Sequence, residues 1–151
     1  MKVVVGSDER TPLVDEVVRD LRRRGYDVEL TGPPAGEDIQ WAEVGREVGE
    51  RVATGAAETG VLFCWTGTGA SIAANKVRGV RAALCTDPQT AEGARKWNDA
   101  NVLVMSLRLT SPPMASEMLD AWFETDPDPA EQEVIATIEQ PRQREPDPAA
   151  Q

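Results

Sequence analysis

The stretch LFCWTGTGASIAANK, residues 62–76, decides how this 151-residue chain folds. It begins with apolar residues typical of a buried strand and then passes through Cys64. A glycine-rich turn at 66–69 follows, and a short helical pattern runs over 71–77. The stretch therefore predicts a strand that leads directly into a helix through a tight turn.

The same alternation recurs along residues 1–125. Helical patterns separate short apolar runs of strand character. The expected strands are 3–6, 27–30, 60–64, 81–85 and 102–105, and the expected helices are 12–24, 39–53, 71–77, 88–97 and 111–123. Strands and helices in this order predict an α/β domain, in which a parallel sheet has helices on both faces.

The character of the chain changes after residue 125. One more helix is expected at 130–139, with Val134, Ile135 and Ile138 on one side. We treat 126–140 as a docking segment, because so short a helix must pack on its own body or on a partner subunit. The polar, proline-containing segment 141–151 is predicted to be disordered.

The composition excludes several classes of partner. The formal net charge of −10 disfavours nucleic acid. No apolar run has the roughly 20 residues that a membrane span requires, and no leader pattern is present, so we expect a cytoplasmic protein. There is no histidine, and the cysteines Cys64 and Cys85 lie far apart, so we expect neither a metal nor another cofactor.

Ligands of open parallel sheets bind beyond the carboxyl ends of the strands. Residues 66–69 should lie there, with backbone N–H groups free at a helix N-terminus for an anion or an oxyanion. A simple tight turn explains the glycines equally well. Asp8, at the end of the first strand, could bind hydroxyl groups or cap the next helix.

Cys64 has two interpretations. A thiol near a helix N-terminus can act as a base or a nucleophile, whereas most buried cysteines are small core residues. For Cys85, which has less chemistry beside it, we expect the core role.

Four motifs together resemble one family. They are GSD at 6–8, the Cys64–Lys76 motif, RAALCTDPQTA at 81–91 and NDANVLV at 98–104. In order and spacing they are similar to the ribose-5-phosphate isomerase B and galactose-6-phosphate isomerase family, over residues 1–125. The resemblance implies a Rossmann-like three-layer α/β/α fold with a five-stranded parallel sheet. It also implies a homodimer, or a tetramer of paired dimers, with active sites shared between subunits.

The resemblance further implies aldose–ketose isomerisation of a sugar phosphate through an enediol, without a metal. It assigns proton transfer to Cys64 and places Thr66 in the catalytic loop. The residues that it implies for binding the substrate or its intermediate are Asp8, Gly67, Thr68, Gly69, Ser71, Asn98 and Arg108.

The chain departs from the family pattern in its aromatic and basic residues. Histidines of the family are replaced by Glu9 and Trp97, a glycine by Trp65, and a tyrosine by Trp41. The segment 129–139, where the family has phosphate-binding residues, contains no basic residue, and Arg10 is the expected substitute for an anionic group.

These changes have two explanations, a decayed site or a pocket rebuilt for another ligand, and we favour the second. The sequence thus predicts an isomerase for an acyclic or non-phosphorylated hydroxy-carbonyl compound, with poor activity on ribose 5-phosphate. A non-catalytic ligand-binding or scaffold protein is the alternative, and a related enolisation or dehydration enzyme is a third.

Overall fold

A five-stranded parallel sheet forms the centre of the molecule, which the computed structural model describes for residues 1–141 and 149. The strand order is β2-β1-β3-β5-β4, and every neighbouring pair is parallel. The strands are β1 (Lys2–Ser7), β2 (Asp27–Thr31), β3 (Thr59–Cys64), β4 (Ala82–Leu84) and β5 (Val102–Ser106). The predicted α/β fold with a parallel sheet is confirmed.

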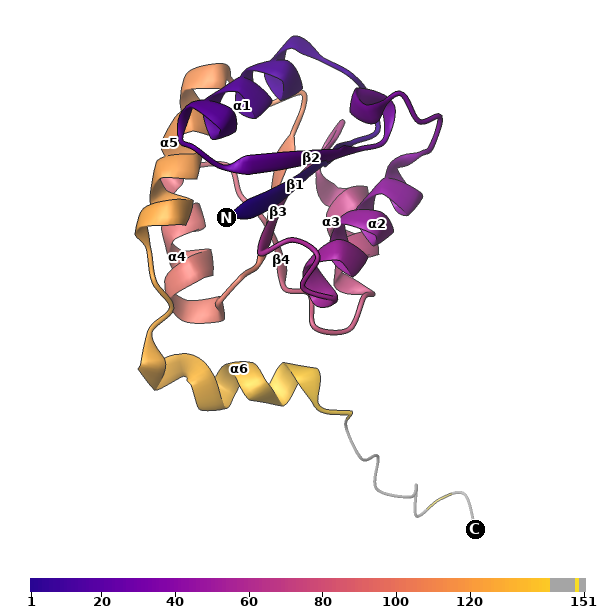
Figure 1. Ribbon diagram of the computed structural model, residues 1–151. Helices are drawn as coiled ribbons and strands as arrows, with labels where there is room; N and C mark the ends of the chain where they lie inside the picture. Colours follow the sequence, from indigo (N-terminus) through magenta and orange to yellow (C-terminus); the bar gives the residue numbers. More distant parts are fainter. Residues whose placement is uncertain (142–148, 150–151) are drawn as a thin grey trace.

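Helices cover both faces of the sheet and make three layers (Figure 1). One face carries α1 (Pro12–Arg23), α4 (Pro88–Asn98) and α5 (Pro112–Glu124), and the other carries α2 (Trp41–Ala53) and α3 (Thr68–Asn75). The central strands β3 and β5 are buried along their whole length, as expected for strands covered on both sides.

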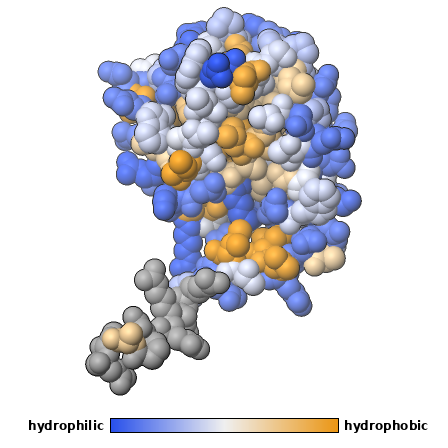
Figure 2. Space-filling model, turned by 180° about the vertical axis from the view of Figure 1, so that it is seen from behind, coloured by the Kyte–Doolittle hydropathy of each residue, from blue (hydrophilic) through white to orange (hydrophobic). Residues whose placement is uncertain are grey.

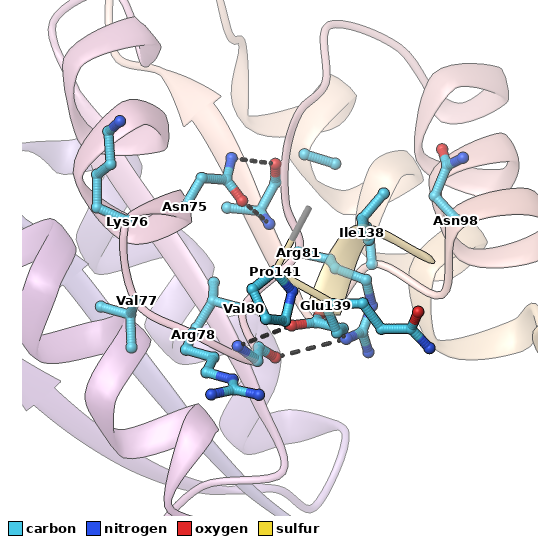
Figure 3. A pocket seen from close by; sticks show the side chains of 15 residues that line it. Asn75, Lys76, Val77, Arg78, Val80, Arg81, Asn98, Ile138, Glu139 and Pro141 are labelled. Carbon is cyan, nitrogen blue, oxygen red and sulfur yellow. Dashed lines mark hydrogen bonds and ion pairs between the residues drawn. The ribbon is translucent and has the colours of Figure 1, made fainter. Parts of the chain in front are cut away.

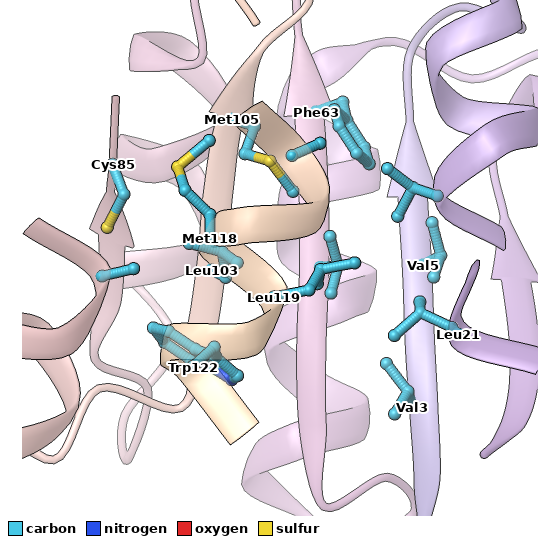
Figure 4. Packing of buried hydrophobic residues seen from close by; sticks show 14 of the residues in the cluster. Val3, Val5, Leu21, Phe63, Cys85, Leu103, Met105, Met118, Leu119 and Trp122 are labelled. Atoms are coloured by element: carbon cyan, nitrogen blue, oxygen red, sulfur yellow. The ribbon is translucent and has the colours of Figure 1, made fainter. Parts of the chain in front are cut away.

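The larger core lies between the sheet and α1, α4 and α5 (Figure 4). Phe63 and Met105 project into it from the sheet, and Leu119 and Trp122 project from α5. Trp122 is buried, and its indole N–H donates a hydrogen bond of 3.1 Å to the hydroxyl of Thr59. Trp122 is therefore a core residue.

The turn before α3 differs from the sequence prediction. Helix α3 begins at Thr68, although the pattern suggested residue 71. Gly67 is the N-cap, with φ of +80°, and this left-handed conformation closes the turn one residue before the helix. Ser71 therefore belongs to the first turns of the helix and not to the preceding loop.

The C-terminal helix α6 (Gln132–Glu139) follows a single 3₁₀ turn, η2 (Pro129–Glu131), and partly docks on the body. Ile135 is buried, and Glu139 accepts hydrogen bonds from Gly79 N–H and from Arg81 (Figure 3). Val134 and Ile138 are 63% and 66% exposed, and apolar surface gathers along this helix (Figure 2). The predicted apolar side is thus only partly covered.

Most of the tail predicted at 141–151 lies outside the described residues, which include only Pro141 and Ala149 from that range. None of the helices in the described part of the chain has the length and apolar character that a bilayer-spanning segment requires.

Candidate active site

The carboxyl ends of β1, β3 and β5 bring the main candidate residues to one edge of the sheet. Ser7 pairs with Phe63, and Cys64 pairs with Ser106. Asp8 directly follows the last residue of β1, so continuing the register by one residue sets it beside Cys64, and neighbouring strands lie about 4.8 Å apart. The loop from Thr66 to Gly69 continues from β3 at the same edge.

Cys64 closes β3 as an almost buried residue, with 5% of its surface exposed. It belongs to the smaller core, which lies under α2 and α3. Its carbonyl accepts a hydrogen bond of 3.0 Å from Leu107 N–H, which fixes the end of the strand. The thiol therefore lies on a rigid element directly before the glycine turn.

Trp65 follows Cys64 and has a fixed backbone but a free side chain. Its carbonyl accepts hydrogen bonds from the Ser106 hydroxyl at 2.9 Å and from Arg108 N–H at 3.1 Å. Its indole is 58% exposed at the carboxyl edge of the sheet. Ser106 was not among the predicted site residues, although a serine directly after the apolar run 102–105 indicates a polar side chain at this edge of the sheet.

The glycine turn leaves the N-terminus of α3 open. No side chain among the described residues caps this helix, so its first N–H groups are available to an anion. The φ of +80° at Gly67 would strain any residue with a side chain, and an added Cβ would lie 2.5 Å from Leu84 Cδ1, which would have to shift. The hydroxyl oxygens of Thr66 and Thr68 lie 2.9 Å apart at this turn.

Trp41 lies over the start of α3. A Cβ at Gly69 would come within 2.8 Å of the indole Cε3 of Trp41, so the ring packs on the bare glycine backbone. The indole is still 44% exposed. Together with Trp65 it supplies an aromatic surface beside the helix N-terminus.

Asp8 has an unsatisfied oxygen. Its Oδ1 is buried and has no hydrogen-bond partner among the described residues. Thr11, and not Asp8, caps α1, because its side chain accepts from Val14 N–H. Burial, and secondly the charge of Glu9, raise the pKa of Asp8 above its ordinary value. Asp8 is therefore available to a ligand and retains its proton to higher pH than an exposed aspartate.

Two arginines follow strand ends at this edge. Arg10 follows β1, and its Nε lies 3.5 Å from Oδ1 of Asp15, with most of the side chain in solvent. Arg108 follows β5 and is exposed. Both are placed to meet an anionic group that approaches from solvent.

Trp97 and Asn98 are not brought to Cys64 of the same chain. They end α4, which runs back from the carboxyl edge of the sheet toward the start of β5. The Trp97 ring packs on Gly93. Trp97 and Asn98 both line a hollow of about 740 Å³ beside β4. Asn98 also borders a second hollow with Ile138 of α6.

Cys85 is a core residue. It is fully buried, and burial, with a smaller contribution from the charge of Asp87, raises the pKa of its thiol to about 12. A thiol of this kind stays protonated and unreactive at neutral pH. Across the described residues, no group of three or more metal-ligating side chains occurs.

Comparison with known proteins gives a consistent result. A family model described as Ribose/Galactose Isomerase matches residues 3–138. The chain is 37% identical to ribose-5-phosphate isomerase B of Escherichia coli, with 86% of this chain and 90% of that protein covered. It is 32% identical to D-erythrulose-4-phosphate isomerase of Pectobacterium atrosepticum, and the match covers 83% of this chain and 84% of that protein.

Among solved structures, ribose-5-phosphate isomerase B of Clostridium thermocellum superposes with a TM-score of 0.86. It is 35% identical, and the match covers 92% of this chain and 95% of that one.

Proposed function

Because the chain belongs to the ribose/galactose isomerase family, we propose that it is an aldose–ketose isomerase with Cys64 as its proton-transfer base. The substrate is a short, open-chain sugar or sugar phosphate. Proton transfer between C1 and C2 passes through an enediol, whose developing negative charge needs hydrogen-bond donors.

The position of Cys64 is the observation that carries this proposal. The thiol ends β3 directly before a helix N-terminus whose first N–H groups are not capped by a side chain among the described residues. An oxyanion bound next to the thiol is stabilised by these N–H groups. A base and an oxyanion site side by side are the two parts that enolisation requires.

The remaining roles follow from position at the same edge. The backbone N–H groups of Thr68 and Gly69 bind the enediolate oxygen, and the hydroxyls of Thr66 and Ser71 assist them. Asp8 binds a substrate oxygen through its unpartnered carboxyl oxygen. Trp41 and Trp65 contact the carbon chain of the substrate.

The aromatic replacements support an acyclic substrate. With Trp97 in place of a histidine and no histidine elsewhere, the chain has no imidazole to open a sugar ring. D-Erythrulose 4-phosphate, named for one relative, has no hydroxyl group that can close a five-membered ring on its C2 carbonyl, and its aldose isomer cannot close one because O4 is esterified. A four-carbon sugar of this type is the first candidate, with Arg10 and Arg108 beside its terminal group.

The proposed assembly is a homodimer with shared sites. Trp97 and Asn98 lie too far along α4 to reach Cys64 of their own chain, so they would complete the site of a partner. The hollow beside β4 would receive the partner's edge. The exposed Val134 and Ile138 of α6 are apolar surface that the same contact would cover.

The activity is tested by ¹³C NMR of purified protein with D-erythrose 4-phosphate, D-erythrulose 4-phosphate and ribose 5-phosphate. Interconversion of the four-carbon pair, faster than that of ribose 5-phosphate, supports the proposal. Tight binding of these sugars without conversion of any hydroxy-carbonyl compound would favour a ligand-binding or scaffold protein instead.

Shared sites are tested by complementation. Cys64→Ala and Asn98→Ala chains, each inactive alone, are unfolded together and refolded. If sites are shared, about a quarter of them recover, because half of the dimers are mixed and each mixed dimer holds one intact site. No recovery in dimers shown to be mixed would mean that each site lies within one chain.

A further inference from the structure

We propose that Asp8 is a second proton-transfer group, which moves the proton between the two substrate oxygens while Cys64 moves the proton between the two carbons. The inference rests on the proposed function, since it assigns the second half of the same isomerisation.

The first support is position. Continuing the β1–β3 register by one residue sets Asp8 beside Cys64, at the ends of neighbouring strands. Side chains alternate along a strand, and registered partners project to the same face. Val4 and Cys64 both project toward α2 and α3. Asp8 lies four residues after Val4, an even spacing, so its side chain is expected on the same face of the sheet. A substrate whose C1 and C2 lie over Cys64 thus has O1 and O2 within reach of Asp8.

The second support is the unsatisfied oxygen. Asp8 Oδ1 is the one buried side-chain nitrogen or oxygen atom in the described part of the chain that has no hydrogen-bond partner. Buried polar atoms in native proteins are almost always paired, so this atom calls for a partner that arrives with the ligand. The oxygens of a cis-enediol are such partners, because they lie side by side and match the two oxygens of one carboxyl group.

The third support is the ionisable environment. Glu9 and Arg10 follow Asp8 in the same loop, Cys64 ends the neighbouring strand β3, and Glu47 on α2 bonds to Thr31 at the end of β2. Of these groups, Glu9 is the one whose charge acts on Asp8, and it reinforces the effect of burial in raising the pKa of Asp8. A carboxyl group with a raised pKa keeps its proton to higher pH than an ordinary aspartate, so the proton is there to be donated to a carbonyl oxygen.

The step balances with these two groups alone. The Cys64 thiolate removes the proton from C2, the electrons of that C–H bond form the C1=C2 bond, and O1 takes the proton of Asp8. The Asp8 carboxylate then removes the proton from O2, which becomes the ketone oxygen. The electrons of the C1=C2 bond take the proton of Cys64 at C1. Both groups return to their starting protonation states.

The test compares kinetics of Asp8→Asn with those of wild type on a substrate that wild type converts. The amide still binds an oxygen but cannot exchange its proton as a carboxyl group does. We expect kcat to fall about 100-fold or more with KM nearly unchanged, and the alkaline limb of the kcat/KM–pH profile, which reports loss of the Asp8 proton, to disappear. A rise in KM with kcat retained would mean that Asp8 only binds the substrate, and would overturn the proposal.

A second variant keeps the proposal testable if Asp8→Asn folds poorly. Glu9→Gln removes the neighbouring charge and should move the alkaline limb to lower pH, because the pKa of Asp8 falls and its proton is lost sooner as the pH rises. Asp38→Asn, an exposed acid in the loop after β2, is the control and should leave the profile in place. An alkaline limb that does not move in Glu9→Gln contradicts the proposal, whereas absence of activity in wild type would instead contradict the isomerase function.

Discussion

The indole of Trp41 packs directly on the backbone of Gly69, where an added Cβ would come within 2.8 Å of the ring. The contact joins the first turn of α2 to the first turn of α3, next to the proposed oxyanion site. It explains why a glycine, a poor helix former, occupies the second position of α3.

Gly69→Ala should therefore destabilise the protein, although alanine favours a helix. Displacing the indole is expected to lower the free energy of unfolding by about 1–3 kcal/mol, measured by urea denaturation. In a Trp41→Ala background the same change should be neutral or stabilising by up to about 1 kcal/mol. Equal losses in both backgrounds would show that Trp41 is not the cause.

Glu139 should control how firmly α6 is held. Its carboxylate accepts from Arg81 at 2.9 Å and from Gly79 N–H at 3.1 Å, and both side chains are partly buried. Glu139→Ala should increase hydrogen exchange of the α6 amides about tenfold, which corresponds to about 1.4 kcal/mol. Glu133→Ala, an exposed change on the same helix, is the control. Unchanged exchange in Glu139→Ala would mean that apolar packing alone holds the helix.

Cys85 should make the protein less stable in alkali. Its thiol ionises near a pKa of 9.0 when exposed, whereas burial and Asp87 raise the folded-state pKa to about 12. The unfolded chain therefore loses a proton that the folded chain keeps. The stabilisation that the buried, protonated Cys85 thiol provides is complete below pH 9 and is lost as the pH rises toward 12. Over this range the free energy of unfolding falls by up to about 1.4 kcal/mol per pH unit. In Cys85→Ala, the free energy of unfolding measured with urea should fall less steeply with pH above 9 than in wild type. Equal dependence on pH in the two proteins would contradict this prediction.

Trp97→His should change which substrates are used. An imidazole at this position can assist ring opening, so the ratio of kcat/KM for ribose 5-phosphate to that for D-erythrulose 4-phosphate should rise about tenfold or more. Lys96→His, which places the imidazole one residue away, is the matched control. A rise in both variants, or in neither, would show that position 97 does not set the preference for open-chain substrates.

The sequence was most informative where local chemistry decides the structure. Ser111 before Pro112 indicated the start of α5, and the Ser111 side chain indeed accepts from Met114 N–H. Trp122 lies within the predicted helix 111–123, and it is buried in the core. In both cases the signal lies within one helix.

Long-range relationships could not be predicted in the same way. Glu139 and Arg81 are 58 positions apart, so nothing in the local sequence indicates that they pair. The unsatisfied oxygen of Asp8 depends on which loop residue takes the N-cap position of α1, and Thr11 takes it. The start of α3 also depends on a single backbone angle at Gly67.

The central claim is that Cys64 transfers the substrate proton, and deuterium exchange tests it most directly. The protein is incubated in D₂O with D-erythrulose 4-phosphate, and deuterium at C1 and C2 is followed by NMR. Wild type and Cys85→Ala should exchange deuterium into the substrate at similar rates, whereas the exchange rate of Cys64→Ala should be about 100-fold or more lower. Exchange by Cys64→Ala at the wild-type rate would contradict the account.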